Sequence, residues 1–179
     1  SRVEEVLKEI DKLIKEIKER VKRLIEESKR LNREDEERVR KVIEESKKTL
    51  EEIREVMERN KESREELEKL IEDDKEKNRK AKKDNDDSLR DDKRKNDEVE
   101  KEVRKRAKDI ERAIKEIAKR NVDKDLLREI ERRLREMLKE IEERIRRSKR
   151  EVEESAERSE RLIRKSEEDS ERVLRELRR

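Results

Sequence analysis

The sequence predicts an all-α protein of three long helices, and three observations carry that prediction. The chain contains no Gly, no Pro and no aromatic residue, and 64% of it is Asp, Glu, Lys or Arg. Its composition is dominated by strong helix formers, above all Glu, Lys, Arg, Leu and Ile. Its apolar residues recur at steps of three and four, which is the period of one helix face. Together these features are typical of a coiled coil or a long helix.

The first predicted helix covers about residues 2–30. Its apolar stripe is interrupted just beyond that point, where Asn32 suits an N-cap with Asp35 at the third helical position. We therefore expect a tight turn near 31–34.

The second predicted helix is very long and covers about 33–120. The signal for its end is stronger, because Asn121 tolerates the left-handed conformation that closes a helix. Asp123 then caps the next helix, with Val122 and Leu127 placed as a hydrophobic staple.

The third predicted helix is long and covers about 124–179. The apolar period of the chain lies close to 3.6 residues, which favours nearly straight helices. The two flanking helices together match the middle one in length, so both are expected to lie antiparallel on it, with free ends meeting near 62–66. The sequence thus predicts a single elongated rod over 1–179.

The middle of this rod, about 72–98 paired with 148–170, is nearly devoid of apolar residues but keeps the helical phase. The turn at Asn121 sets Asn and Ser positions opposite one another: Asn96 beside Ser148, Leu89 beside Ser155, Asn85 beside Ser159 and Asn78 beside Ser166. Buried layers of hydrogen-bonded Asn and Ser would specify register and partner number. A hydrated, loosely packed stretch and an irregular break near 84–97 are the alternatives.

The structural residues expected from these patterns form a polar seam and an apolar core. The polar seam comprises Ser46, Asn60, Asn78, Asn85, Ser88, Asn96, Ser148, Ser155, Ser159, Ser166 and Ser170. The apolar core includes Ile10, Ile14, Ile53, Ile114, Ile130, Leu134 and Ile141. A two-helix rod shares too little surface to exclude water from so wide a stripe. We therefore expect a homo-oligomer, a trimer first and a dimer next, with a designed partner chain as an alternative.

The same composition argues against chemistry. There is no His, Cys or Gly for a nucleophile motif or a phosphate loop, and inward-facing carboxylates are rare, with Asp74 and Asp92 as the exceptions. We expect no catalytic, cofactor-binding or metal-binding residue, and no cofactor. Net charge is +3 with both signs interleaved, which disfavours a nucleic-acid patch, and no run is long and apolar enough to span a membrane.

The chain resembles a computationally designed parametric helical bundle with hydrogen-bond-network layers. The seam Ile, Leu and Val residues carry the resemblance, together with the seam Asn and Ser residues and the Glu, Lys and Arg exterior. The resemblance implies a self-assembling structural scaffold with no natural biochemical function, not an enzyme, and with no natural location beyond soluble recombinant expression in a cytoplasm. A natural-like coiled-coil rod that mediates protein–protein interaction and a single-helix spacer are the alternatives.

Overall fold

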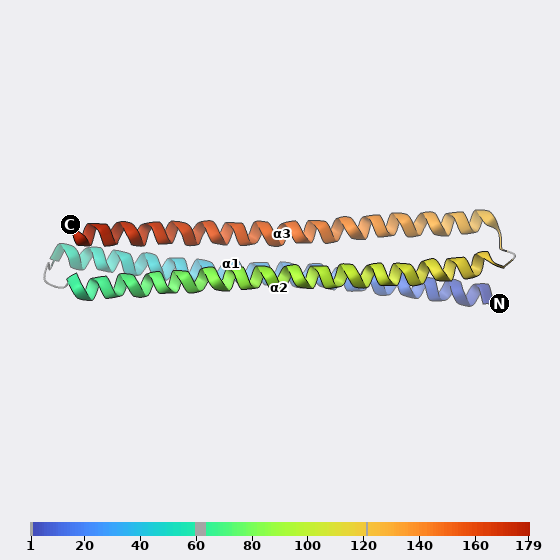
Figure 1. The fold of residues 1–179 in the computed structure, drawn as a ribbon, viewed down its shortest axis with the longest axis horizontal. Helices are drawn as coiled ribbons and strands as arrows, with labels where there is room; N and C mark the ends of the chain where they lie inside the picture. Colours follow the sequence, from blue (N-terminus) through green and yellow to red (C-terminus); the bar gives the residue numbers. More distant parts are fainter. Residues whose placement is uncertain (1, 60–63, 121) are drawn as a thin grey trace. The chain divides into compact units, whose positions relative to one another are not determined.

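The computed structural model describes residues 2–59, 64–120 and 122–179, and these residues form three helices (Figure 1). Helix α1 spans Arg2–Arg59, α2 spans Arg64–Ala118 and α3 spans Lys124–Arg178. Their lengths are 58, 55 and 55 residues, and no strand occurs within the described ranges. The predicted fold class, all-α with three long helices, is confirmed.

The predicted turn near 31–34 is wrong, and so is the short, very long, long order of helices. Helix α1 continues through Asn32 and ends at Arg59. Nothing in this stretch forbids a helix, because Asn and Asp cost only a few tenths of a kcal/mol in a helix interior. Asp35 does not cap a helix; its carboxylate instead accepts a hydrogen bond from Ser88 of α2.

The start of α3 lies where the sequence placed it. Asp123 directly precedes the helix, and its Oδ1 accepts a hydrogen bond from the backbone N–H of Asp125 at 3.1 Å, which is N-cap geometry. Val122 and Leu127 both pack against the neighbouring apolar core, as expected for a hydrophobic staple. Asn121, the predicted helix-closing residue, lies outside the described residues.

The chain divides into two compact units, each built from parts of all three helices. Unit 1 comprises Ser1–Lys29 and Asp92–Glu151, and unit 2 comprises Arg30–Asp91 and Val152–Arg179. Since three helices contribute to each unit, the single-helix spacer is wrong. The two-helix cross-section expected from the sequence is also wrong, since α1 is twice as long as predicted.

Unit 1 has one large apolar core to which α1, α2 and α3 all contribute, including Ile17, Ile110 and Ile145. Ion pairs join its helices at the rim, among them Arg20 to Glu102 at 3.1 Å and Lys95 to Glu27 at 3.4 Å. In these pairs the residue number rises on α2 as it falls on α1, so the two helices run antiparallel within this unit.

Unit 2 has two smaller apolar cores. One contains Ile53, Ile71 and Val173 with their neighbours, and the other is formed by Val39, Ile43, Ala81 and Ile163. Each again draws on all three helices. Along every helix, polar residues separate the two cores.

Five of the seven predicted core residues are buried: Ile10, Ile53, Ile114, Leu134 and Ile141. Ile14 and Ile130 are only half-buried, contrary to the prediction. Both pack against the core of unit 1 but occupy its edge, because the apolar stripe is wider than the face that three helices enclose.

Candidate functional site

The most connected group of buried polar side chains lies in unit 2 and is called here the Asp74 cluster. It consists of Ser46 from α1, Asp74 and Asn78 from α2, and Ser166 and Ser170 from α3, all of them buried. Residues four apart share a helix face, so Asp74 with Asn78, and Ser166 with Ser170, each present two polar groups to the same interior.

Hydrogen bonds link these five side chains into one chain. Asn78 Nδ2 donates to Ser166 Oγ at 3.0 Å, and Ser166 Oγ donates to Ser46 Oγ at 3.0 Å. Ser46 Oγ then donates to Asp74 Oδ2 at 2.7 Å, and Ser170 Oγ donates to the same oxygen at 2.8 Å. All three helices are therefore joined through polar groups removed from solvent.

The Asp74 cluster lies between the two apolar cores of unit 2. Ile43 and Leu50 flank Ser46 on α1, and Ile163 and Val173 flank the two serines on α3. Apolar side chains therefore border the cluster on both sides along the helices, and in such surroundings hydrogen bonds are stronger and an unpaired polar group is costly. Each such bond contributes only about 0.5–1.5 kcal/mol net. The cluster therefore matters more for the choice of helix pairing and register than for the free energy of unfolding.

A second group of polar contacts in unit 2 is less complete. Asn85 Nδ2 donates to the backbone carbonyl of Ala156 at 3.1 Å, and half-buried Ser88 donates to Asp35. Ser155 and Ser159 are buried, and Ser159 Oγ makes no hydrogen bond with any residue that the structure describes.

A third group lies in unit 1, where Ser28, Asp92, Asn96 and Ser148 are buried. Asn96 Nδ2 donates to the carbonyl of Asp92 in its own helix at 2.8 Å. Within the described part of the chain, Asn96 Oδ1 and Ser28 Oγ have no hydrogen-bond partner.

The predicted side-chain contacts between α2 and α3 are only partly present. Asn78 contacts Ser166 as expected, whereas Asn85 bonds the backbone at Ala156 and not Ser159. The predicted break near 84–97 is wrong, because α2 is continuous there. Asn60 lies outside the described residues.

Sequence reasoning missed the central role of Asp74. Its seam position was apparent, but Ser46 was assigned to the same helix as Asp74, which made a contact between them impossible. Contact between Ser46 and Asp74 requires the chain to reverse its direction between these two residues.

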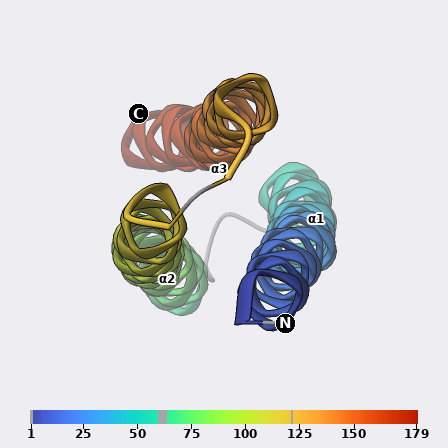
Figure 2. The ribbon, with the colours of Figure 1, turned by 90° about the vertical axis from the view of Figure 1, so that its right-hand side faces the viewer.

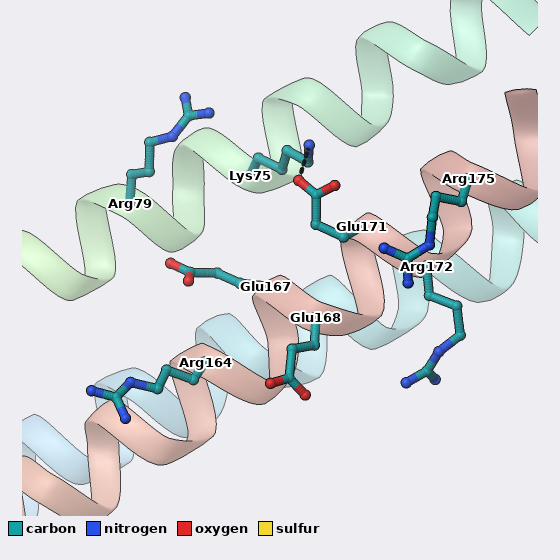
Figure 3. Close-up of a pocket in the computed structure, with 8 residues that line it drawn as sticks. All are labelled: Lys75, Arg79, Arg164, Glu167, Glu168, Glu171, Arg172 and Arg175. Atoms are coloured by element: carbon teal, nitrogen blue, oxygen red, sulfur yellow. Dashed lines mark ion pairs between the residues drawn. The ribbon is translucent and has the colours of Figure 1, made fainter.

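Unit 2 also has a charged furrow between α2 and α3, with a volume of about 630 Å³. Figure 3 shows Lys75 reaching across it to Glu171, while Arg172 and Glu168 extend away. The Lys75 Nζ to Glu171 Oε1 distance is 2.5 Å. The hydrogen bond from Lys75, and then its charge, lower the pKa of Glu171.

In unit 1, Lys149 of α3 forms the corresponding link to α2. Its Nζ lies 2.9 Å from Asp97 Oδ1 and 2.6 Å from Glu100 Oε2. The hydrogen bond from Lys149 lowers the pKa of Asp97. The hydrogen bonds to Asp97 and Glu100 raise the pKa of Lys149.

The buried serine hydroxyls of the Asp74 cluster are committed to one another and to a carboxyl group, without an imidazole or amine among the five that could act as a base. Among the described residues, no cluster of His, Cys, Asp and Glu could hold a metal ion. No helix in the described ranges is long and apolar enough to cross a membrane.

Comparison with known proteins gives one informative likeness. No protein-family model matches the chain, and no curated protein does. The chain is similar to a solved structure described as a computationally designed three helix bundle, with a TM-score of 0.58 and 21% sequence identity. The match covers 98% of this chain and 88% of that one. At this identity the likeness establishes the fold, a three-helix bundle, and leaves function to be argued from the residues.

Proposed function

We propose that this protein is a designed structural scaffold, a helical-bundle component that has no enzymatic activity. The observation that carries the proposal is the Asp74 cluster, a hydrogen-bonded polar layer from three helices set between two apolar cores. Its role is to act as a hydrogen-bond network that selects which helices pair and in which register.

The physical basis is a difference between right and wrong pairings. In the native register the five side chains satisfy one another. A shift of one helix by a turn sets Asp74 or Asn78 against Ile and Leu, which leaves a buried polar group unpaired at a cost of about 1–3 kcal/mol. Apolar side chains alone tolerate such slips, so the polar layer supplies specificity that the cores lack.

The composition supports a designed origin. A chain without Gly, Pro, His, Cys or aromatic residues follows the binary pattern and the surface helix propensity that design uses. We expect soluble expression in a bacterial cytoplasm, and a far-ultraviolet circular dichroism spectrum of an almost wholly helical protein.

The test replaces the polar layer by an apolar one in the double variant Asp74→Leu/Asn78→Leu. Helix content should persist. The single set of amide resonances expected for the native protein should broaden or split, because more than one register becomes accessible. Two-dimensional amide NMR measures this directly.

A matched control makes a similar polar-to-apolar change on the surface, at exposed Asp73 and Lys77. The control variant Asp73→Leu/Lys77→Leu should keep one sharp set of resonances. If the buried variant also gave one sharp set in the native register, the specificity role of the cluster would be contradicted.

Self-assembly is a separate part of the proposal. The expected homotrimer, or dimer, assumes a rod that is two helices wide, whereas each unit contains parts of three helices. Self-association therefore depends on the apolar side chains left exposed, which include Val56, Leu70, Leu126 and Leu162. Light scattering after size-exclusion chromatography tests it: a multiple of 22.2 kDa supports a homo-oligomer, and a monomer at micromolar concentration contradicts it.

A further inference from the structure

Unit 1 has a groove between α1 and α3 with a volume of about 300 Å³. Lys22 and Lys29 of α1 and Arg144 and Arg147 of α3 line it, against two acidic side chains, Glu26 and Glu151. The groove therefore carries a net positive charge within a protein whose charges otherwise nearly balance.

The other two seams of unit 1 are closed by ion pairs. Arg20 and Arg106 are paired with acids across α1 and α2, and Lys149 joins α3 to α2. Figure 2 shows the start of α1, the end of α2 and the start of α3 at the corners of a triangle, so α1 and α3 share a seam. The α1/α3 seam of this unit contains the groove.

An apolar strip continues along the α1 edge of the groove. Ile25 lines the groove, and Leu7 lies 18 residues before it, about five helical turns, on the same face. Ile14 lies 11 residues before Ile25, about three turns. All three are half-buried and pack against the core of unit 1, so each leaves some apolar surface exposed along this face of α1, with Ile25 at the groove itself.

The α3 edge matches this strip. Leu126 is 41% exposed and lies 18 residues before Arg144, which places it on the groove-facing side of α3. The α1/α3 seam therefore combines apolar side chains on both helices with cations at one end. An amphipathic helix with apolar residues at steps of three and four, and acidic residues beside them, has the complementary pattern.

We propose that the α1/α3 groove of unit 1 docks an acidic amphipathic helix from a partner chain. Its apolar face contacts Leu7, Ile14 and Ile25, and its carboxylates pair with Lys22, Arg144 and Arg147. This inference rests on the proposed scaffold function and names the partner that the scaffold holds. Charge complementarity of this kind sets partner choice and association rate.

The test uses two synthetic amphipathic helices of about 28 residues, long enough to form a helix on binding. Both carry Leu on one face; one has Glu at the flanking positions and the other has Lys. Fluorescence anisotropy should show the Glu peptide binding at least tenfold more tightly than the Lys peptide. The variant Lys22→Glu/Arg144→Glu, at two exposed positions, should reverse this preference.

The matched control changes the same net charge in unit 2, with Arg172→Glu/Arg175→Glu at exposed positions, and should leave both affinities unchanged. Equal binding of the two peptides, binding of neither, or a shift caused by the unit 2 variant would overturn the inference. So would a dimer that Lys22→Glu/Arg144→Glu dissociates, since a second copy would then fill the groove. Circular dichroism of each variant separates a lost partner site from a failed scaffold.

Discussion

At the scale of single residues, two hydrogen bonds of the Asp74 cluster converge on one carboxyl oxygen. Asp74 Oδ2 accepts hydroxyl hydrogen bonds from α1 and from α3, and a serine hydroxyl has a single proton to donate. Ser46 donates to Asp74, whereas Ser170 can also donate to the backbone carbonyl of Ser166 at 3.1 Å, so Ser46 depends more on Asp74 than Ser170 does. The carboxyl group, more than any one serine, joins the three helices.

Removal of this acceptor should be costly. We predict that Asp74→Ala lowers the free energy of unfolding by about 1–3 kcal/mol, because buried Ser46 loses its acceptor and Ser170 keeps only the carbonyl of Ser166. Urea denaturation measures the change. The control Asp73→Ala alters an exposed neighbour and should stay within about 0.5 kcal/mol; equal effects of the two substitutions would show that the cluster contributes no local stability.

Two buried serines of α3 should respond in opposite directions. Ser166 accepts from Asn78 and donates to Ser46, whereas Ser159 Oγ makes no hydrogen bond with a described residue. Ser166→Ala should lower the free energy of unfolding by about 1–2 kcal/mol, and Ser159→Ala should leave it unchanged or raise it by up to about 1 kcal/mol. Thermal unfolding of the two variants ranks them, and a larger loss for Ser159→Ala would contradict the hydrogen bonding described here.

At the scale of helices, the sequence predicts the helical conformation and the connection between α2 and α3, but it does not predict the connection between α1 and α2. Asp123 has both a capping side chain and an apolar staple beside it, two signals that agree. Asn32 offered only a weak cap preference, which the helix tolerates at small cost. The pattern Ser63 with Glu66 three residues later is a capping-box signature that points to the other connection, but it competes with many similar Ser and Glu spacings in this chain.

The error in that connection explains why the candidate site was only half predicted. The pairing of Asn78 with Ser166 depends on the connection between α2 and α3, which was placed correctly. The contacts of Ser46 with Asp74 and of Ser88 with Asp35 depend on the connection between α1 and α2, which was not. Periodicity identifies which residues face inward, but the residues that they meet are decided by where the chain reverses.

The link between α2 and α3 at Lys149 should depend on pH at both extremes. The raised pKa of Lys149 means that its stabilisation is present below the ordinary value of 10.5 and is lost as pH rises through the folded value. The lowered pKa of Asp97 means that its stabilisation is present above 3.8 and is lost as pH falls through the folded value.

Lys149→Met isolates this contribution. At pH 7 the variant should be less stable than the parent by up to about 1 kcal/mol, the range of solvent-exposed ion pairs. The difference should shrink when urea denaturation is repeated well above pH 10.5 or well below pH 3.8, the ordinary values for Lys149 and Asp97. Lys139→Met changes an exposed lysine of the same helix and should show no such pH profile. A Lys149→Met difference that is constant with pH would assign its effect to packing.

At the scale of the whole molecule, polar and apolar levels alternate along each helix. Residues 99–117 and 134–145 contribute to the large apolar core of unit 1. Residues 85–96 and 148–159 contribute few apolar side chains, and they contain Asn96 Oδ1 and Ser159 Oγ, which are buried without a hydrogen-bond partner among the described residues. The Asp74 cluster is polar too, but it is satisfied and has an apolar core on each side.

This alternation makes the local stability of the chain uneven, which amide hydrogen exchange resolves along each helix. We predict the slowest exchange in 99–117 and 134–145, where apolar burial is greatest. The fastest exchange outside the helix ends should occur in 85–96 and 148–159. Residues 71–81, which carry Asp74 and Asn78, should be intermediate, since their polar groups are paired.

Asn96→Leu provides the decisive comparison, because it removes an unpartnered buried amide oxygen and adds apolar contact in the same position. Exchange should slow across 92–99 and on the facing part of α3, with little change in 71–81. The control Lys93→Leu adds a similar apolar side chain at an exposed position, where it is not buried. It should have no such effect. Exchange that is uniform along all three helices of the parent protein would mean that the molecule opens only as a whole, and that its polar levels leave no local weakness.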